Sequence, residues 1–220
     1  VLNRGVDGRK LFFDSQDYAR FVHDLYEFND TRPADNLHRL FDPEMKDIRC
    51  LSFQRDREKL VEIHGWCLMD NHYHLLISEL IEGGLLKFMK KVNIGYARYY
   101  NDRYQRYGHL FQGKTKKVVL KDHSHFLYIL HYLHLNPLDY LEGASGWRVR
   151  DKSSIRSVRE ALEYLHTYRW SSYLDYCDEK NFPSLITKDL FAHALGAYPK
   201  EIESYLKDVE TIPADDLILE

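Results

Sequence analysis

The sequence lacks both a cysteine framework and a membrane-spanning run. Its 220 residues include only three cysteines, Cys50, Cys67 and Cys177, which stand far apart and are odd in number. They give neither the close spacing of a zinc knuckle nor the even set of a disulfide scaffold, so a reducing cytoplasm is the expected location. No apolar run approaches the roughly 18 residues that a membrane helix needs, so we expect no membrane partner.

Acidic residues are nearly absent from the middle of the chain. Between Lys87 and Lys121 the only acid is Asp102, although the formal net charge of the whole chain is -3. Such a basic stretch can follow the phosphates of a nucleic acid, and the alternative is an ordinary solvated helix face. The candidate DNA-binding residues are Lys87, Lys90, Lys91, Arg98, Arg103, Lys114, Lys116 and Lys117.

Alternating and helical patterns follow one another up to about residue 140. They predict strands near 1–4, 60–69, 72–78 and 116–121, and helices near 15–29, 85–104 and 123–136. The pair Asp70-Asn71 is a natural tight turn between two antiparallel strands. This order predicts an α+β fold, a ferredoxin-like sandwich with a mostly antiparallel sheet and helices on one face.

Two other segments do not fit that pattern. Residues from about 30 to 60 contain Pro33 and Pro43 without a clean period, and indicate a long insertion. After residue 140 the patterns are those of short helices, so 141–220 is expected to be a helical C-terminal extension of a domain that spans 1–140.

The stretch CLMDNHYHLLI places His72 and His74 one residue apart in a predicted strand. Residues i and i+2 of a strand point to the same face, so the two imidazoles can meet one metal ion. A pair of surface or hydrogen-bonded histidines is the alternative, because a His-x-His pattern alone is common.

A second pattern, HYLHLNP, places Tyr132 and Asn136 one turn apart on a predicted helix. The Asn136 carbonyl could complete a metal site with the two histidines, and Tyr132 could be a nucleophile beside it. Alternatively, Tyr132 is a core aromatic and Asn136 a helix C-cap. Tyr128 competes for the nucleophile's role, and His131 and His134 are interpreted as capping or surface residues.

The chain resembles the REP-associated tyrosine transposases, within the HUH single-tyrosine transposase family of insertion sequences. Four blocks carry the likeness in order, NRGVDGRKLFF, CLMDNHYHLLI, GHLFQGKTKKVVL and YLHLNP, and WSSYLDY extends it weakly. His72, Tyr73 and His74 fit the family's His-hydrophobic-His motif. Asp70 stands where the family commonly has proline.

The resemblance implies a catalytic domain over 1–140 that cuts and rejoins single-stranded or hairpin DNA through a 5′-phosphotyrosine. Tyr132 matches the family's nucleophile, and His72, His74 and Asn136 match its ligands for Mg²⁺ or Mn²⁺. A monomer is favoured, although a homodimer is possible. One alternative is a domesticated hairpin-binding protein of the same fold that no longer catalyses, and a less favoured one is a metal-dependent phosphohydrolase.

Overall fold

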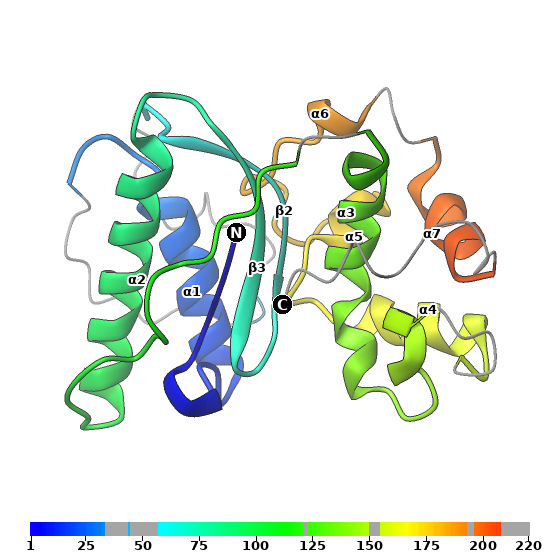
Figure 1. Cartoon of the computed structure of the whole chain (residues 1–220), viewed down its shortest axis with the longest axis horizontal. Coiled ribbons are helices and arrows are strands. Elements are labelled where there is room, and N and C mark those ends of the chain that lie inside the picture. The colour runs from blue at the N-terminus through cyan, green and yellow to red at the C-terminus, as the bar shows by residue number, and fades with distance from the viewer. Residues whose placement is uncertain (34–43, 45–56, 121–122, 150–154, 193–195, 208–220) are drawn as a thin grey trace.

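The computed structural model describes residues 1–33, 44, 57–120, 123–149, 155–192 and 196–207, and these form an α+β fold (Figure 1). The predicted fold class is therefore confirmed, whereas the insertion expected at about 30–60 lies mostly outside the described residues. The strands of the described part are β1 (Leu2–Arg4), β2 (Val61–Leu68) and β3 (His72–Glu79). The α-helices are α1 (Ser15–Glu27), α2 (Gly84–Arg103), α3 (His123–Leu135), α4 (Val158–Thr167), α5 (Tyr173–Tyr176), α6 (Asp189–Ala192) and α7 (Tyr198–Lys207), and the 3-10 turns are η1 (Val6–Gly8), η3 (Asn136–Tyr140) and η4 (Ser145–Val149).

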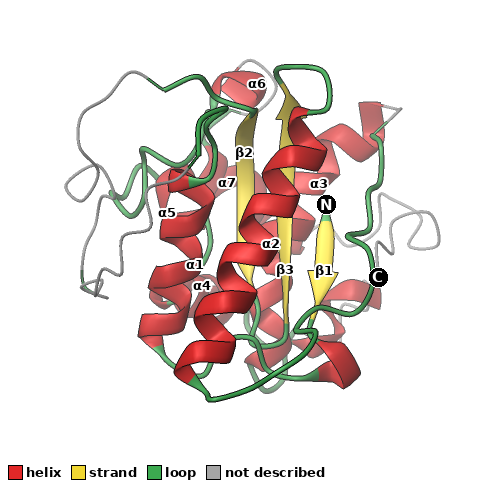
Figure 2. Cartoon of the chain, turned by 90° about the vertical axis from the view of Figure 1, so that its left-hand side faces the viewer, coloured by secondary structure: helices red, strands yellow, loops and turns green. Residues whose placement is uncertain are grey.

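The sheet is antiparallel, with β3 between β1 and β2 (Figure 2). The register pairs His74 with Leu2 on one side and with Cys67 on the other. The turn between β2 and β3 is the predicted one at Asp70-Asn71, closed by a bond from Met69 N to His72 O of 2.8 Å. β3, the central strand, therefore carries its side chains at the middle of the sheet.

Helices cover both faces of the sheet, whereas the sequence predicted helices on one face. Figure 1 shows α1 and α2 on one side of the strands and α3 on the other. The alternation along β3 serves both layers, because Tyr73 and Leu75 enter the core beneath α1 and α2, and Leu76 enters the core beneath α3. His72 and His74, in phase with Leu76, therefore face α3.

The strand predicted at 116–121 is absent from the described residues 116–120. Lys116 alone pairs with the sheet edge, through Leu2 N to Lys116 O at 3.1 Å and Lys116 N to Leu2 O at 2.9 Å. Val118 and Val119 are 52% and 73% exposed. Their β-branched side chains resemble a strand in sequence, but no sheet face is there to bury them.

The helical C-terminal region is confirmed, and it packs against α3. Leu165 of α4 and Tyr198 and Ile202 of α7 share one buried core with Leu133 of α3. The segment before α5 also lies along β2, with Ser172 N donating to Trp66 O at 2.9 Å. In the part of the chain that the structure describes, no helix has the length and apolarity needed to cross a bilayer.

Candidate active site

The histidine pair lies on the α3 side of β3. His72 and His74 are 8% and 4% exposed, and their ring centroids are 4.9 Å apart. The Nδ1 atom of His72 is 2.6 Å from Oδ1 of Asn71. Since an amide oxygen only accepts, this bond places the His72 proton on Nδ1 and the ring lone pair on Nε2, the form in which imidazole binds a metal.

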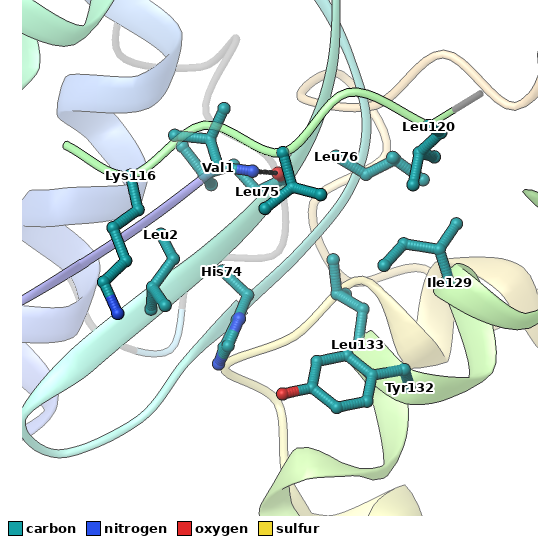
Figure 3. Close-up of a pocket in the computed structure, with 11 residues that line it drawn as sticks. Val1, Leu2, His74, Leu75, Leu76, Lys116, Leu120, Ile129, Tyr132 and Leu133 are labelled. Atoms are coloured by element: carbon teal, nitrogen blue, oxygen red, sulfur yellow. Dashed lines mark hydrogen bonds between the residues drawn. The ribbon is translucent and has the colours of Figure 1, made fainter. Parts of the chain in front are cut away.

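Tyr132 of α3 faces this pair. Its ring centroid is 5.8 Å from that of His74 at an interplanar angle of 84°. Figure 3 shows its hydroxyl directed toward His74. The side chain is 3% exposed. Tyr132 is therefore both a buried core aromatic and a neighbour of the histidines, the two alternatives that the sequence offered.

Asn136 ends α3 and caps it. Its Nδ2 donates to the backbone oxygens of Tyr132 and Leu133, at 2.7 and 3.4 Å, which satisfies carbonyls that the helix end leaves open. Asn136 is fully buried, and Pro137 follows in η3. Asn136 therefore forms the predicted C-cap through Nδ2, and its Oδ1 takes no part in the cap.

Sequence reasoning missed a fifth contributor, Arg148 of η4. Its Nη1 donates to the Tyr132 hydroxyl at 2.9 Å, and its Nη2 donates to Asn136 Oδ1 at 2.6 Å. The same guanidinium forms an ion pair with Asp139 at 2.8 Å. Nothing in the spacing of GWRVR pointed to this place, because η4 reaches α3 only through the fold of the intervening turn.

The donor set fits a divalent cation in part. The two imidazoles share one face at contact distance, which suits a metal that accepts nitrogen ligands. Asn136 Oδ1, by contrast, accepts a charge-assisted bond from Arg148 and does not offer its oxygen toward the histidines in this arrangement. Among the described residues, no group of three or more His, Cys, Asp or Glu side chains could hold a metal ion, so further ligands would have to come from amide, water or substrate oxygens.

A pocket opens beside Tyr132 and His74. It lies between the sheet edge, the 116–120 segment and α3, and its wall is mostly apolar (Figure 3). Lys116 brings a positive charge to its rim from the segment that pairs with β1. The pocket is thus lined by an exposed lysine, Lys116, and by a buried tyrosine, Tyr132.

The eight basic residues predicted to contact DNA fall into two groups. Lys87, Lys91 and Arg103 of α2 are tied to the protein itself, since the two lysines donate to the Thr31, Asp30 and Arg32 carbonyls and Arg103 pairs with Asp14 and Asp17. The other five are exposed, namely Lys90, Arg98, Lys114, Lys116 and Lys117. Of these five, Lys116 lies beside the histidine pair, because it lines the same pocket as His74.

Two other histidines of α3 point away from Tyr132. His134 is fully buried, with Nδ1 2.6 Å from the Tyr198 hydroxyl and Nε2 2.7 Å from Ser172 Oγ. His131 stacks between the rings of Tyr198 and Tyr205. Their interpretation as capping or surface residues was wrong, because α7 and the segment before α5 cover this side of α3.

Neither Tyr128 nor Cys67 has the surroundings of Tyr132. Tyr128 lies one turn earlier on α3, where its ring contacts Tyr205 of α7 at 5.5 Å. Cys67, the cross-strand partner of His74, is fully buried, and desolvation raises the pKa of its thiol well above the usual range. A protonated thiol is a poor nucleophile and a poor metal ligand.

Residues 38–136 match the family model described as "Transposase IS200 like". The matched region contains His72, His74, Tyr132 and Asn136 and ends before Arg148. No curated protein and no solved structure matches the chain. The match supports transposase activity and DNA binding for this region.

Proposed function

We propose that this protein is a transposase that cuts single-stranded hairpin DNA with Tyr132 and rejoins it through a 5′-phosphotyrosine. The observation that carries the proposal is the contact between the His74 ring and Tyr132, which brings a buried histidine pair and a tyrosine together from two elements inside the matched region. The REP-associated group, with its hairpin substrates, is the subfamily that the sequence blocks resemble.

In the proposed step the Tyr132 oxygen attacks a backbone phosphorus. The Oη–P bond forms, the bond from phosphorus to the 3′ oxygen breaks, the phenolic proton is lost and the departing 3′ oxygen gains a proton. The phosphodiester is replaced by a phosphotyrosine of similar energy, so a second 3′-hydroxyl can reverse the reaction without ATP. A tyrosine at this position therefore suits strand transfer.

We further propose Mg²⁺ or Mn²⁺ as the cofactor, held by His72 and His74 and, once its oxygen is released, by Asn136. When bound, such an ion would polarise the scissile phosphate and offset its charge. The chain's own part is to keep both rings on one strand face and to fix the His72 tautomer through Asn71.

Attack within one chain is the simplest arrangement. Tyr132 and the histidine pair come together in a single copy, which supports a monomer that acts in cis. The exposed lysines at 114, 116 and 117 would hold the DNA backbone beside the pocket. A cytoplasmic location, where such DNA is found, is part of the same proposal.

One observation favours the second candidate, a hairpin-binding protein that no longer catalyses. Tyr132 is 3% exposed and its hydroxyl is bonded to Arg148, so the nucleophile is covered in this arrangement. A hydrolase is less well supported, since the described residues lack the acidic cluster that a two-metal hydrolase uses.

A covalent-adduct assay tests the proposal. The protein is incubated with hairpin DNA from beside its own gene and Mn²⁺ or Mg²⁺, and the products are separated on a denaturing gel. We expect a slowly migrating adduct that disappears with EDTA, with His74→Ala and with Tyr132→Phe. Tyr128→Phe, one turn earlier on the same helix, is the matched control and should keep the adduct.

The alternatives give different gels. Tight, salt-sensitive hairpin binding without an adduct would support the non-catalytic protein. If no adduct forms and the Tyr132→Phe variant still cleaves the DNA, the hydrolase would be supported.

A further inference from the structure

Arg148 joins the two residues that the sequence had singled out on α3. One guanidinium edge contacts the Tyr132 hydroxyl and Asn136 Oδ1, at 2.9 and 2.6 Å, from a turn that lies beyond the matched region. We propose that Arg148 is a catalytic residue, which positions the attacking oxygen of Tyr132 and neutralises charge on the phosphate that Tyr132 attacks. This inference rests on the proposed function.

The guanidinium is held in place before any DNA arrives. Its other edge meets Asp139, with Nη2 to Oδ2 at 2.8 Å and Nε to both carboxylate oxygens at 3.3 Å. Asp139 also accepts from Trp147 Nε1 at 2.8 Å, and the Arg148 guanidinium carbon lies 4.6 Å from the centre of the Trp147 ring. Its orientation is thus set by η3 and η4, and the cost of ordering a long side chain is met in folding.

The chemistry of arginine suits a phosphate in this place. A guanidinium stays protonated throughout, presents a planar fork of donors and binds phosphate oxygens in pairs. Since Nη1 already donates to Tyr132 Oη, phosphorus bonded to Oη would bring a non-bridging oxygen next to Nη1, while Nε and Nη2 stay bonded to Asp139 and Asn136. Arg148 would then stabilise charge through hydrogen bonds while the bonds made and broken are those of the tyrosine step, and it would itself exchange no proton.

The contrasting view is that Arg148 is only a structural tie. Its ion pair with Asp139 links η3 to η4, and losing it would loosen the end of α3. A tie predicts a loss of folded protein in proportion to the loss of activity. A catalytic residue predicts a slower covalent step in protein that remains folded and still binds the hairpin.

The experiment measures single-turnover adduct formation by Arg148→Gln and Arg148→Lys. The matched control is Arg156→Gln, an exposed arginine in the same region whose backbone N bonds Gly143 O at 3.1 Å. Melting midpoints and the affinity for uncleaved hairpin are recorded for every variant. One further substrate carries a methylphosphonate at the cleavage position, which removes the charge of one non-bridging oxygen.

We expect Arg148→Gln to slow the covalent step by about 100-fold or more, the loss typical of one preorganised donor. Hairpin affinity should change less than threefold, Arg148→Lys should recover part of the rate, and Arg156→Gln should match the unmodified protein. On the methylphosphonate the deficit of Arg148→Gln should shrink, because less charge is left to neutralise.

Three results would overturn the inference. One is an adduct from Arg148→Gln at the unmodified rate. Another is a rate loss that only tracks the loss of folded or hairpin-bound protein. The third is no adduct from the unmodified protein, which removes the proposed function and this inference together, whereas the first two leave the proposed function standing.

Discussion

Acid should lower the free energy of unfolding through His134, which joins α3 to the C-terminal region. Both ring nitrogens are bonded, to the Tyr198 hydroxyl and to Ser172 Oγ, and the side chain has no exposed surface. Burial, with a smaller contribution from the nearby His131, lowers the pKa of His134 well below 6.5. The folded protein therefore keeps this imidazole neutral at a pH where the unfolded chain protonates it.

The sign and size follow from that difference. Below about pH 6.5 the unfolded state binds one more proton at His134 than the folded state, so the free energy of unfolding falls as the pH falls. The loss approaches about 1.4 kcal/mol for each pH unit well below pH 6.5, until the folded-state pKa is reached. At higher pH, His134→Gln should cost about 1–3 kcal/mol, because one of two buried hydrogen bonds loses its partner.

Urea denaturation followed by tryptophan fluorescence at pH 7.5, 6.5 and 5.5 measures both effects. The difference in free energy of unfolding between the original protein and His134→Gln should narrow by about 1 kcal/mol from pH 6.5 to 5.5, because the unfolded-state histidine is already about half protonated at the upper pH. The exposed His109→Gln is the control and should keep the original pH dependence. A difference that stays constant with pH would refute the assignment of the acid sensitivity to His134.

Two further predictions separate packing from DNA contact. Gly84→Ala should lower the free energy of unfolding by about 1–3 kcal/mol, because a Cβ at this position would lie 2.5 Å from the backbone oxygen of Leu60. Leu86→Ala, on the exposed side of α2, should change the free energy of unfolding by less than about 0.5 kcal/mol. Urea denaturation measures both variants, and equal effects would contradict the packing argument. Lys116→Gln should reduce the slope of log affinity against log salt concentration for hairpin DNA by about 0.7. Lys91→Gln should leave that slope unchanged but lower the melting midpoint, because Lys91 Nζ donates to backbone carbonyls. The reverse assignment of the two lysines would show that DNA lies on the α2 side.

Local spacing predicted the part of the site that local geometry determines. The i, i+2 relation of a strand placed His72 and His74 on one face, and the i, i+4 relation of a helix placed Asn136 beneath Tyr132. That the two pairs meet was implied by the family likeness, and a backbone pattern alone could not have shown it. The fold class was accessible for the same reason, since alternating and helical periods are local.

The rest depends on contacts between distant segments. Arg148 reaches Tyr132 only because η3 turns the chain after Pro137 and η4 folds back along α3, and no periodicity encodes that return. The misread strand at 116–120 has the same origin, because Val118 has strand propensity but lies beyond the edge that Lys116 completes. Tertiary context overrode a correct local preference.

Three aromatic rings and one pocket border Tyr132. Its ring is bordered by His74 at 5.8 Å, by Tyr128 at 6.0 Å and by Trp147 at 5.7 Å. Tyr132 also lines the pocket, together with His74 and Lys116. A DNA backbone that entered there would meet the lysine at the rim and then the Tyr132 oxygen, with Arg148 already bonded to that oxygen. Arg148 does not line the pocket, but it is bonded to the oxygen of a tyrosine that does, so the proposed attack requires DNA to reach that oxygen from the pocket.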